Sequence, residues 1–210
     1  MPKQVRLSFI QTLNSIPFRG FFWSKKSTKE MAIDLYNQGQ LNEAMGAFQQ
    51  ALAEETRAYG EMSDSVREIY SFMGAIYQAQ GRPQEAIDCY TSALEINNTL
   101  HGEDDPNSIG IYTGIGQGHE TLGDFDAARE YYERALGIAQ SHPQNSDEIL
   151  LQLATCYEAM GRLCHAEGKY DQALEFHQDS IDIRQRTSED NSILITNYLA
   201  LGKLYLDMGR

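Results

Sequence analysis

Apolar and small residues recur along this chain with a helical period, and a longer period lies over it. Apolar positions three and four residues apart share one face of a helix, so each such stretch predicts an amphipathic helix. Turn glycines separate the stretches at steps of 42, 42, 45 and 41 residues: Gly39, Gly81, Gly123, Gly168 and Gly209. A repeat of this length, with a helix on each side of the turn, predicts an α-solenoid of stacked helix pairs with a long exposed groove.

The same kinds of residue return at the same distance from each turn glycine. Seven residues before the turn lies a tiny residue, and nine residues after it lies a bulky one, flanked by alanine or serine. The tiny residues are Ala32, Gly74, Gly116, Gly161 and Gly202, and the bulky ones are Phe48, Tyr90, Tyr132 and His177. A large side chain opposite a small one lets two helices pack closely. The pattern predicts an all-α protein of nine helices without strands.

This pattern resembles the tetratricopeptide repeat, which has Leu-Gly and Tyr on its first helix and Ala, Phe and Ala on its second. The resemblance covers residues 28–210 and implies a right-handed superhelix of antiparallel helix pairs, with four full pairs and one half repeat. The usual unit is about 34 residues, so each repeat here is about two helical turns longer. The lengthened units, and the segment 101–106 between two repeats, are similar to those of kinesin light chains.

Local signals mark where some of these helices begin. Pro83 follows a turn glycine, at the first turn of a helix, where its missing N–H is not needed. Asp105 and Pro106 predict the same arrangement, a capping carboxylate followed by a proline. Asp124 lies where a second helix begins, and we expect its side chain to accept free backbone N–H groups there.

Three glycines in the first helix of the third repeat are not explained by the repeat pattern. Gly110, Gly114 and Gly118 surround Gly116, and each costs about 0.8 to 1 kcal/mol relative to alanine in a helix interior. We therefore expect this helix to be the softest part of the array. A phosphate-binding loop is excluded here, because such a loop follows a strand and opens a helix.

The charge of the chain is unevenly distributed. Its 210 residues carry a net charge of −13, but the first 29 hold six basic residues and no acidic one, which leaves 11 basic against 30 acidic residues, a net −19, in the rest. Nucleic acids and anionic lipids bind cationic surfaces, so an acidic body argues against both. We expect no nucleic acid partner, and membrane contact only through the N-terminal segment.

Residues 1–27 form a basic leader that the repeat does not include. Val5, Phe9, Leu13 and Ile16 recur at steps of four and three, which predicts an amphipathic helix. Three interpretations stay open: a tail or cap on the end of the solenoid, an organelle-targeting peptide, and a membrane-contacting segment. No secretory signal or membrane-spanning stretch is found. The expected location is therefore cytoplasmic, or mitochondrial or plastid if the leader is a transit peptide.

The chain carries no pattern of a catalytic or metal site. Its histidines, cysteines and carboxylates lack nucleophile–base and metal-ligand spacings. Three cysteines, an odd number without a Cys-x-x-Cys motif, indicate a reducing compartment. We expect a protein that is not an enzyme, with no catalytic residue, no cofactor and no metal ion.

The resemblance also implies where a partner binds. In tetratricopeptide proteins the first helix of each pair lines the concave face, and kinesin-light-chain-like grooves take acidic, aromatic-bearing peptides. The corresponding positions here carry more basic residues than an acidic body would be expected to show, which favours an acidic protein or peptide ligand. The candidate groove residues are Lys29, Tyr36, Asn37, Gln78, Arg82, Gln117, Arg162, His165, Lys169 and Lys203.

We therefore expect a protein–protein interaction scaffold or adaptor that binds a partner peptide or helix in its concave groove. Two alternatives stay open, an organelle-imported assembly factor and a fragment of a larger multidomain repeat protein. The last helix, around residues 193–208, is apolar most of the way round, whereas terminal repeats normally present a polar outer face. That surface predicts either self-association through the C-terminal helix or continuation in a longer array.

Overall fold

The structure is a computed structural model that describes residues 26–142, 146–187 and 194–209. These residues form helices and no strand, as the sequence pattern predicts; residues 1–25 of the leader lie outside the described part. The helices are α2 (Thr28–Asn37), α3 (Leu41–Tyr59), α4 (Asp64–Ala79), α5 (Pro83–His101), α6 (Ser108–Leu122), α7 (Phe125–Ser141), α8 (Asp147–Ala166), α9 (Tyr170–Thr187) and α10 (Leu194–Asp207).

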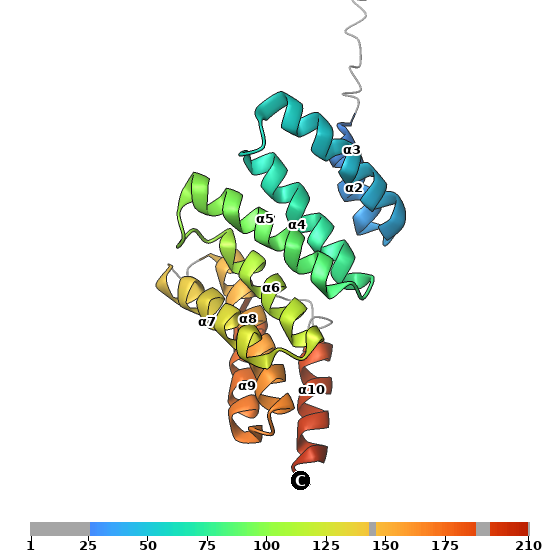
Figure 1. Cartoon of the computed structure of the whole chain (residues 1–210). Coiled ribbons are helices and arrows are strands. Elements are labelled where there is room, and N and C mark those ends of the chain that lie inside the picture. Colours follow the sequence, from blue (N-terminus) through green and yellow to red (C-terminus); the bar gives the residue numbers. More distant parts are fainter. Residues whose placement is uncertain (1–25, 143–145, 188–193, 210) are drawn as a thin grey trace, which may run out of the picture.

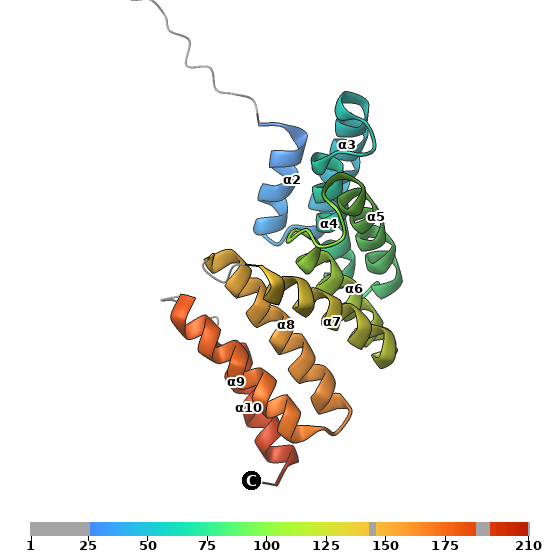
Figure 2. The same ribbon diagram turned by 90° about the vertical axis from the view of Figure 1, so that its left-hand side faces the viewer.

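Consecutive helices pair as α2 with α3, α4 with α5, α6 with α7 and α8 with α9, and α10 begins a fifth pair. The pairs stack along an axis that bends from one pair to the next (Figures 1 and 2). First helices also contact first helices of the next pair: α4 contacts α6, α6 contacts α8, and α8 contacts α10. We call the surface formed by α2, α4, α6, α8 and α10 the inner wall.

The five turn glycines adopt the backbone conformation that their role requires. Their φ angles are 75°, 70°, 82°, 77° and 69° in chain order, in the left-handed region that side chains disfavour. In the first four turns the amide after the glycine donates to a carbonyl near the end of the first helix, as Arg82 does to Tyr77 at 2.9 Å. This arrangement satisfies carbonyls that the helix end leaves free.

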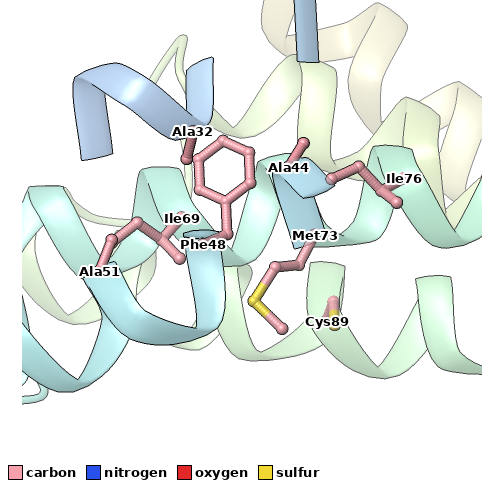
Figure 3. Close-up of a cluster of buried hydrophobic side chains, with 8 residues drawn as sticks. All are labelled: Ala32, Ala44, Phe48, Ala51, Ile69, Met73, Ile76 and Cys89. Carbon is pink, nitrogen blue, oxygen red and sulfur yellow. The ribbon is translucent and has the colours of Figure 1, made fainter. Parts of the chain in front are cut away.

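Within each pair, the bulky residue of the second helix packs on the tiny residue of the first. A Cβ atom added to Gly116 would lie 2.5 Å from the ring of Tyr132, and one added to Gly161 would lie 2.9 Å from the ring of His177. In the first pair the fully buried Phe48 ring is directed at Ala32 (Figure 3). The repeating large-and-small pattern is therefore a set of equivalent contacts that hold the two helices of a pair close together.

Two of the glycines that the repeat did not explain also have a packing role. A Cβ on Gly114 would lie 2.6 Å from the ring of Tyr90, and one on Gly118 would lie 2.5 Å from Ile87. Both contacts join α6 to the second helix of the preceding pair. Gly114 and Gly118 therefore allow close packing between neighbouring pairs. Of the three unexplained glycines, only Gly110 has no packing role, because a Cβ there would meet nothing within 4 Å. The prediction that α6 is soft therefore rests on Gly110 alone.

The predicted helix starts are confirmed at two places and wrong at one. Pro83 is the first residue of α5, and the Asp124 carboxylate accepts the Ala127 amide at 3.2 Å. By contrast, α6 begins two residues after Pro106. Asp105 instead accepts the amide of Asn107 at 3.0 Å, within the turn that precedes the helix. The sequence pattern therefore placed the start of this helix two residues too early.

All three cysteines are buried and free. Burial raises the pKa of the Cys89 and Cys156 thiols to about 11, so both stay protonated at neutral pH. They fill space in the core as small apolar side chains.

His177 is the bulky residue of the fourth pair, where the other pairs have a phenylalanine or a tyrosine. Its side chain is fully buried, and neither ring nitrogen has a hydrogen-bond partner. Burial, with smaller contributions from Arg162 and His165, lowers the pKa of His177 to about 4. The folded protein therefore holds this imidazole in its neutral form.

We expect Gly116→Ala to destabilise the protein by about 1 to 3 kcal/mol, because the added methyl group would press into the buried Tyr132 ring. The matched control is Gly137→Ala on α7, where a Cβ has open space and the gain in helix propensity should stabilise by about 1 kcal/mol. Urea unfolding followed by circular dichroism measures both. Equal effects of the two substitutions would contradict the ring-on-glycine contact.

The neutral His177 should make stability depend on pH. The unfolded state binds a proton near pH 6.5 and the folded state only near about pH 4. The free energy of unfolding should therefore fall as the pH drops between these values, by up to about 1.4 kcal/mol per pH unit. His177→Phe, which copies the residue at position 48, should remove this part of the pH dependence. Chemical denaturation at several pH values would disprove the assignment if the variant kept the full slope.

Candidate functional site

Two adjoining cavities lie along the middle of the inner wall. One, of about 330 Å³, is bordered by α2, α4, α5 and α6, and the other, of about 380 Å³, by α5, α6 and α8. Tyr90 and Gly110 border both. We call this surface the central groove, defined by Tyr36, Phe72, Tyr90, Gly110, Gln117 and Gln152.

The floor of the central groove is a direct product of helix packing. The Tyr90 ring lies against both Gly74 and Gly114, so it passes between α4 and α6. Its hydroxyl then donates to the side-chain oxygen of Gln78 at 3.4 Å, and the Gln78 amide donates to Gln117 at 2.8 Å. Tyr90 of α5 thereby orders the side chains of Gln78 on α4 and Gln117 on α6.

Gly110 keeps the two cavities joined. It is exposed, and a Cβ there would meet nothing within 4 Å, so packing inside the chain does not require a glycine. A glycine in a helix costs about 1 kcal/mol relative to alanine. The missing side chain leaves open space where the two cavities meet.

Aromatic rings form one end of the central groove. Phe72 stacks on Phe48 with ring centroids 5.1 Å apart, and Tyr36 meets the edge of Phe72 at 5.3 Å. The inward faces of Tyr36 and Phe72 border the smaller cavity. This end of the groove offers rigid apolar surface to a ligand side chain.

A third cavity, of about 310 Å³, lies farther along the inner wall between α8, α9 and α10. Its lining residues include Arg162, His165 and Lys203, the neutral His177, and none with a carboxylate. We call it the cationic cavity, defined by Arg162, His165, Ala166, His177, Ala200 and Lys203.

The identity of His177 helps to explain why this cavity exists. In the preceding pair the Tyr132 hydroxyl reaches the inner wall and donates to Glu120 at 2.5 Å. His177 occupies the same register position but lacks the phenol oxygen, and it bonds to no inner-wall side chain. The space that a tyrosine tip would take is left open beside Arg162 and Lys203.

The basic groups of the cationic cavity differ in their partners. Arg162 lies 3.3 Å from Glu120 and 3.5 Å from Glu158. Burial opposes the charged guanidinium, but these carboxylates outweigh it and raise the pKa of Arg162. His165 pairs with Asp207 at 2.7 Å. Lys203 is exposed, and the structure gives it no ion-pair partner in the described part of the chain.

Other predicted groove residues lie on the inner wall or at its turns and are engaged with neighbours. Lys29 binds Glu68 at 2.9 Å. Arg82 pairs with Glu85 at 2.7 Å and lies over the Tyr77 ring. Lys169 pairs with Glu167 at 2.9 Å, in the turn between α8 and α9, and Asn37 is the exposed last residue of α2.

The structure therefore divides the predicted residues into groups. It brings Arg162, His165 and Lys203 together in one cavity, and Tyr36, Gln78 and Gln117 around the central groove. Arg82 and Lys169 lie at turns outside both. The prediction did not include Tyr90, Gly110 or His177. The sequence does single out Gly110, because the repeat pattern does not explain a glycine at that position in a helix. It also singles out His177, because the other repeats have Phe or Tyr at that position.

Across residues 26–142, 146–187 and 194–209, no three histidine, cysteine or acidic side chains are grouped so that they could hold a metal ion. Within the same ranges, no helix has the length and apolar character needed to cross a membrane.

The family model of the tetratricopeptide repeat matches residues 26–98, 65–141 and 147–210. Together these matches cover most of the chain and leave out the leader. The chain belongs to the tetratricopeptide repeat family.

Curated relatives point to two kinds of protein. The chain is 30% identical over 149 residues to the photosystem I assembly protein Ycf3 of Rippkaea orientalis, covering 67% of this chain and 78% of that protein. It is 26% identical over 160 residues to the protein KINESIN LIGHT CHAIN-RELATED 3 of Arabidopsis thaliana, covering 76% of this chain. It spans only 24% of that second relative's length.

Solved structures confirm the lengthened, kinesin-light-chain-like form of the repeats. BtubC (BKLC) from P. vanneervenii superposes with a TM-score of 0.69 at 25% identity, over 87% of this chain and 72% of that one. A putative kinesin light chain of Podosopora anserina gives 0.64 at 20% identity, over 87% and 85%. The fold is that of a tetratricopeptide solenoid, a class of protein-interaction scaffold.

Proposed function

We propose that this protein is an adaptor that holds an acidic segment of a partner protein along its inner wall. The observation that carries the proposal is the cationic cavity, where Arg162, His165 and Lys203 meet without a carboxylate among the lining residues. A chain with a net charge of −13 would not be expected to gather bases in one hollow by chance.

Among the predicted basic groove residues, Lys203 is the one most available to an acidic ligand. Lys29, Arg82 and Lys169 each already pair with a carboxylate of this chain, so a ligand gains little by displacing those acids. Lys203 has no such competitor among the described residues. A carboxylate placed in the cavity would form a charge-assisted hydrogen bond with the Lys203 ammonium group.

The central groove would hold the rest of the segment. Gly110 leaves space for an extended backbone, Gln117 and Gln152 offer amide hydrogen bonds, and Tyr36 and Phe72 offer rings against which an apolar side chain packs. Aromatic or aliphatic anchors supply most of the affinity in such interfaces, while charges set orientation and association rate. The proposed ligand therefore combines acidic residues with an aromatic or aliphatic one.

Selection from a phage library of random peptides of about 12 residues tests this proposal on the purified protein. We expect enrichment of Asp and Glu together with an aromatic or large aliphatic residue. Lys203→Glu should weaken the selected peptides by about tenfold, or about 1.4 kcal/mol, because it places a like charge against the ligand. Lys169→Glu, an exposed lysine outside the cavity, is the matched control and should leave affinity within about twofold of the unaltered protein. Selection of basic peptides, or equal loss in both variants, would refute the proposal.

Gly110→Leu tests the central groove separately. The side chain would enter open space, so the fold should stay intact, but it would occupy the junction of the two cavities and weaken the same peptides by about tenfold. Gly137→Leu places the same side chain on an exposed glycine of α7, away from the inner wall, and should not change affinity. Calorimetric titration gives both values; unchanged binding to Gly110→Leu would exclude the central groove as the ligand path.

A second candidate function is that of an assembly factor working in an organelle. The similarity to a photosystem I assembly protein favours it, as does the similarity to the human protein named tetratricopeptide repeat protein 19, mitochondrial, which is 28% identical over 114 residues. Residues 1–27 fused to a fluorescent protein test the location. Import into mitochondria or plastids would favour this candidate, and diffuse fluorescence would favour the cytoplasmic adaptor.

A further inference from the structure

A cavity on the outer side of the stack lies between the first two pairs. It has a volume of about 580 Å³ and is bordered by α3, α4, α5 and the turn between α3 and α4. Leu52, Val66 and Ile96 contribute apolar side chains to its lining, and the exposed Met62 borders it at the turn. We call it the outer cavity, defined by Leu52, Arg57, Glu61, Tyr70, Ser92 and Glu95.

The next pair of helices shows which side chain fills the equivalent place. Tyr112 occupies on α6 the register position of Tyr70 on α4, eleven residues before the turn glycine. The Arg134 guanidinium of α7 lies 6.0 Å from the centre of the Tyr112 ring. It also lies 2.9 Å from Asp104 and 3.8 Å from Glu103, in the turn that precedes α6. The ring and the carboxylates both attract a cation placed in this way.

The outer cavity is open because a serine on α5 replaces this base. Ser92 has the register position of Arg134, eleven residues after the turn glycine, and its side chain is too short to extend over Tyr70. Glu61, in the turn before α4, has the position of Glu103 and borders the cavity. The first two pairs therefore keep the ring and a turn carboxylate, and the space of the guanidinium is open.

The charged residues of the lining favour a basic occupant. Glu61 and Glu95 contribute two carboxylates, and Arg57 contributes one guanidinium. A basic side chain over the Tyr70 ring would meet the electron-rich face of the ring and a carboxylate at once. The outer cavity therefore suits a segment that combines a base with apolar side chains.

The N-terminal segment of this chain is attached close to the outer cavity. The Thr28 hydroxyl donates a hydrogen bond to the Glu54 carboxylate on α3 and lowers the pKa of Glu54. Lys29 donates to Glu68 on α4 at 2.9 Å. α2 therefore begins beside two of the helices that border the cavity. Residues 18–25 precede it by a few positions, and an extended chain of ten residues spans about 33 Å, enough to pass around a helix of about 10 to 12 Å diameter.

Residues 18–25 also have the matching chemistry. They read Phe-Arg-Gly-Phe-Phe-Trp-Ser-Lys, so four of the eight side chains are aromatic, two are basic and none is acidic. Aromatic rings supply the large apolar surface that fills a cavity of this kind. The two bases, Arg19 and Lys25, are of the type that Arg134 provides in the next pair.

We propose that residues 18–25 dock in the outer cavity of the same chain. The aromatic rings, Trp23 among them, pack on the apolar lining, and a basic side chain lies over Tyr70 beside Glu61. Because the segment is covalently attached near the cavity, docking is intramolecular and does not depend on protein concentration. The docked segment lies on the outer side of the stack, so the inner wall stays open to a ligand.

Trp23 is the only tryptophan of the chain, so its fluorescence reports on this segment in the intact protein. The reference is a synthetic peptide of residues 12–27, in which the indole ring is in water. In the protein, Trp23 should emit at shorter wavelength than in the peptide and should be quenched less by acrylamide, because the ring leaves water on docking. Both differences should persist on dilution.

Ser92→Arg should displace the segment, because it copies Arg134 and fills the outer cavity. The emission of Trp23 should then shift to longer wavelength, and its quenching should rise to that of the peptide. The fold should survive, because the added atoms enter the cavity, and circular dichroism checks this. Thr91→Arg is the matched control. It adds the same charge at the adjacent exposed position of α5, outside the cavity lining, and should leave Trp23 protected.

Glu61→Lys tests the charge of the cavity and should also raise the quenching of Trp23, whereas Glu103→Lys, at the equivalent position of the next turn, should not. Acidic peptides held by the inner wall should bind Ser92→Arg unchanged, which separates this proposal from the adaptor function. Three results would each overturn it: equal quenching of Trp23 in protein and peptide, equal effects of Ser92→Arg and Thr91→Arg, or protection that is lost on dilution and therefore comes from a second copy.

Discussion

The structure depends on one contact, in which a ring of the second helix presses on a residue without a bulky side chain in the first. Tyr90, Tyr132 and His177 meet Gly74, Gly116 and Gly161 in this way, and Phe48 meets Ala32. Short side chains leave little to separate the helix axes, so the rings set the spacing of each pair. Repetition of this contact every forty-odd residues builds a stack whose first helices share the inner wall.

The same contact determines the chemistry of the inner wall. Where the ring is a tyrosine, its hydroxyl reaches the wall and orders a polar side chain, as Tyr90 does with Gln78 and Tyr132 with Glu120. Glu120 in turn pairs with Arg162 of the next first helix. Where the ring is His177, the cationic cavity lies beside it. Differences at one core position thus become differences in the surface that a partner meets.

Much of the fold can be predicted from the sequence because the same local pattern of glycine, small and bulky residues occurs in every repeat. The turn glycines, the bulky-on-tiny pairs and the absence of strands were all predictable from spacing. The roles of Gly114 and Gly118 were not, because their neighbours Tyr90 and Ile87 belong to the preceding pair. Only a structure shows which side chains of different repeats come together.

The candidate site was less predictable for a related reason. Sequence spacing assigned Arg162, His165 and Lys203 to the first helices but could not show that they border one cavity, or that Lys29 and Lys169 already pair with acids. The Lys29–Glu68 pair joins α2 to α4, and the cationic cavity joins α8, α9 and α10, so both depend on how separate helices are placed and not on a residue's position within its repeat.

The central claim is that a partner segment lies along the inner wall rather than on the outer helices. Backbone amide chemical shifts, followed by NMR during titration with an acidic, aromatic-containing peptide, test it most directly. The account predicts that the signals of Gly110, Gln117 and Lys203 shift together and saturate at one concentration, while those of Gly46 and Gly137 on the second helices stay in place. Shifts confined to the second helices would contradict it.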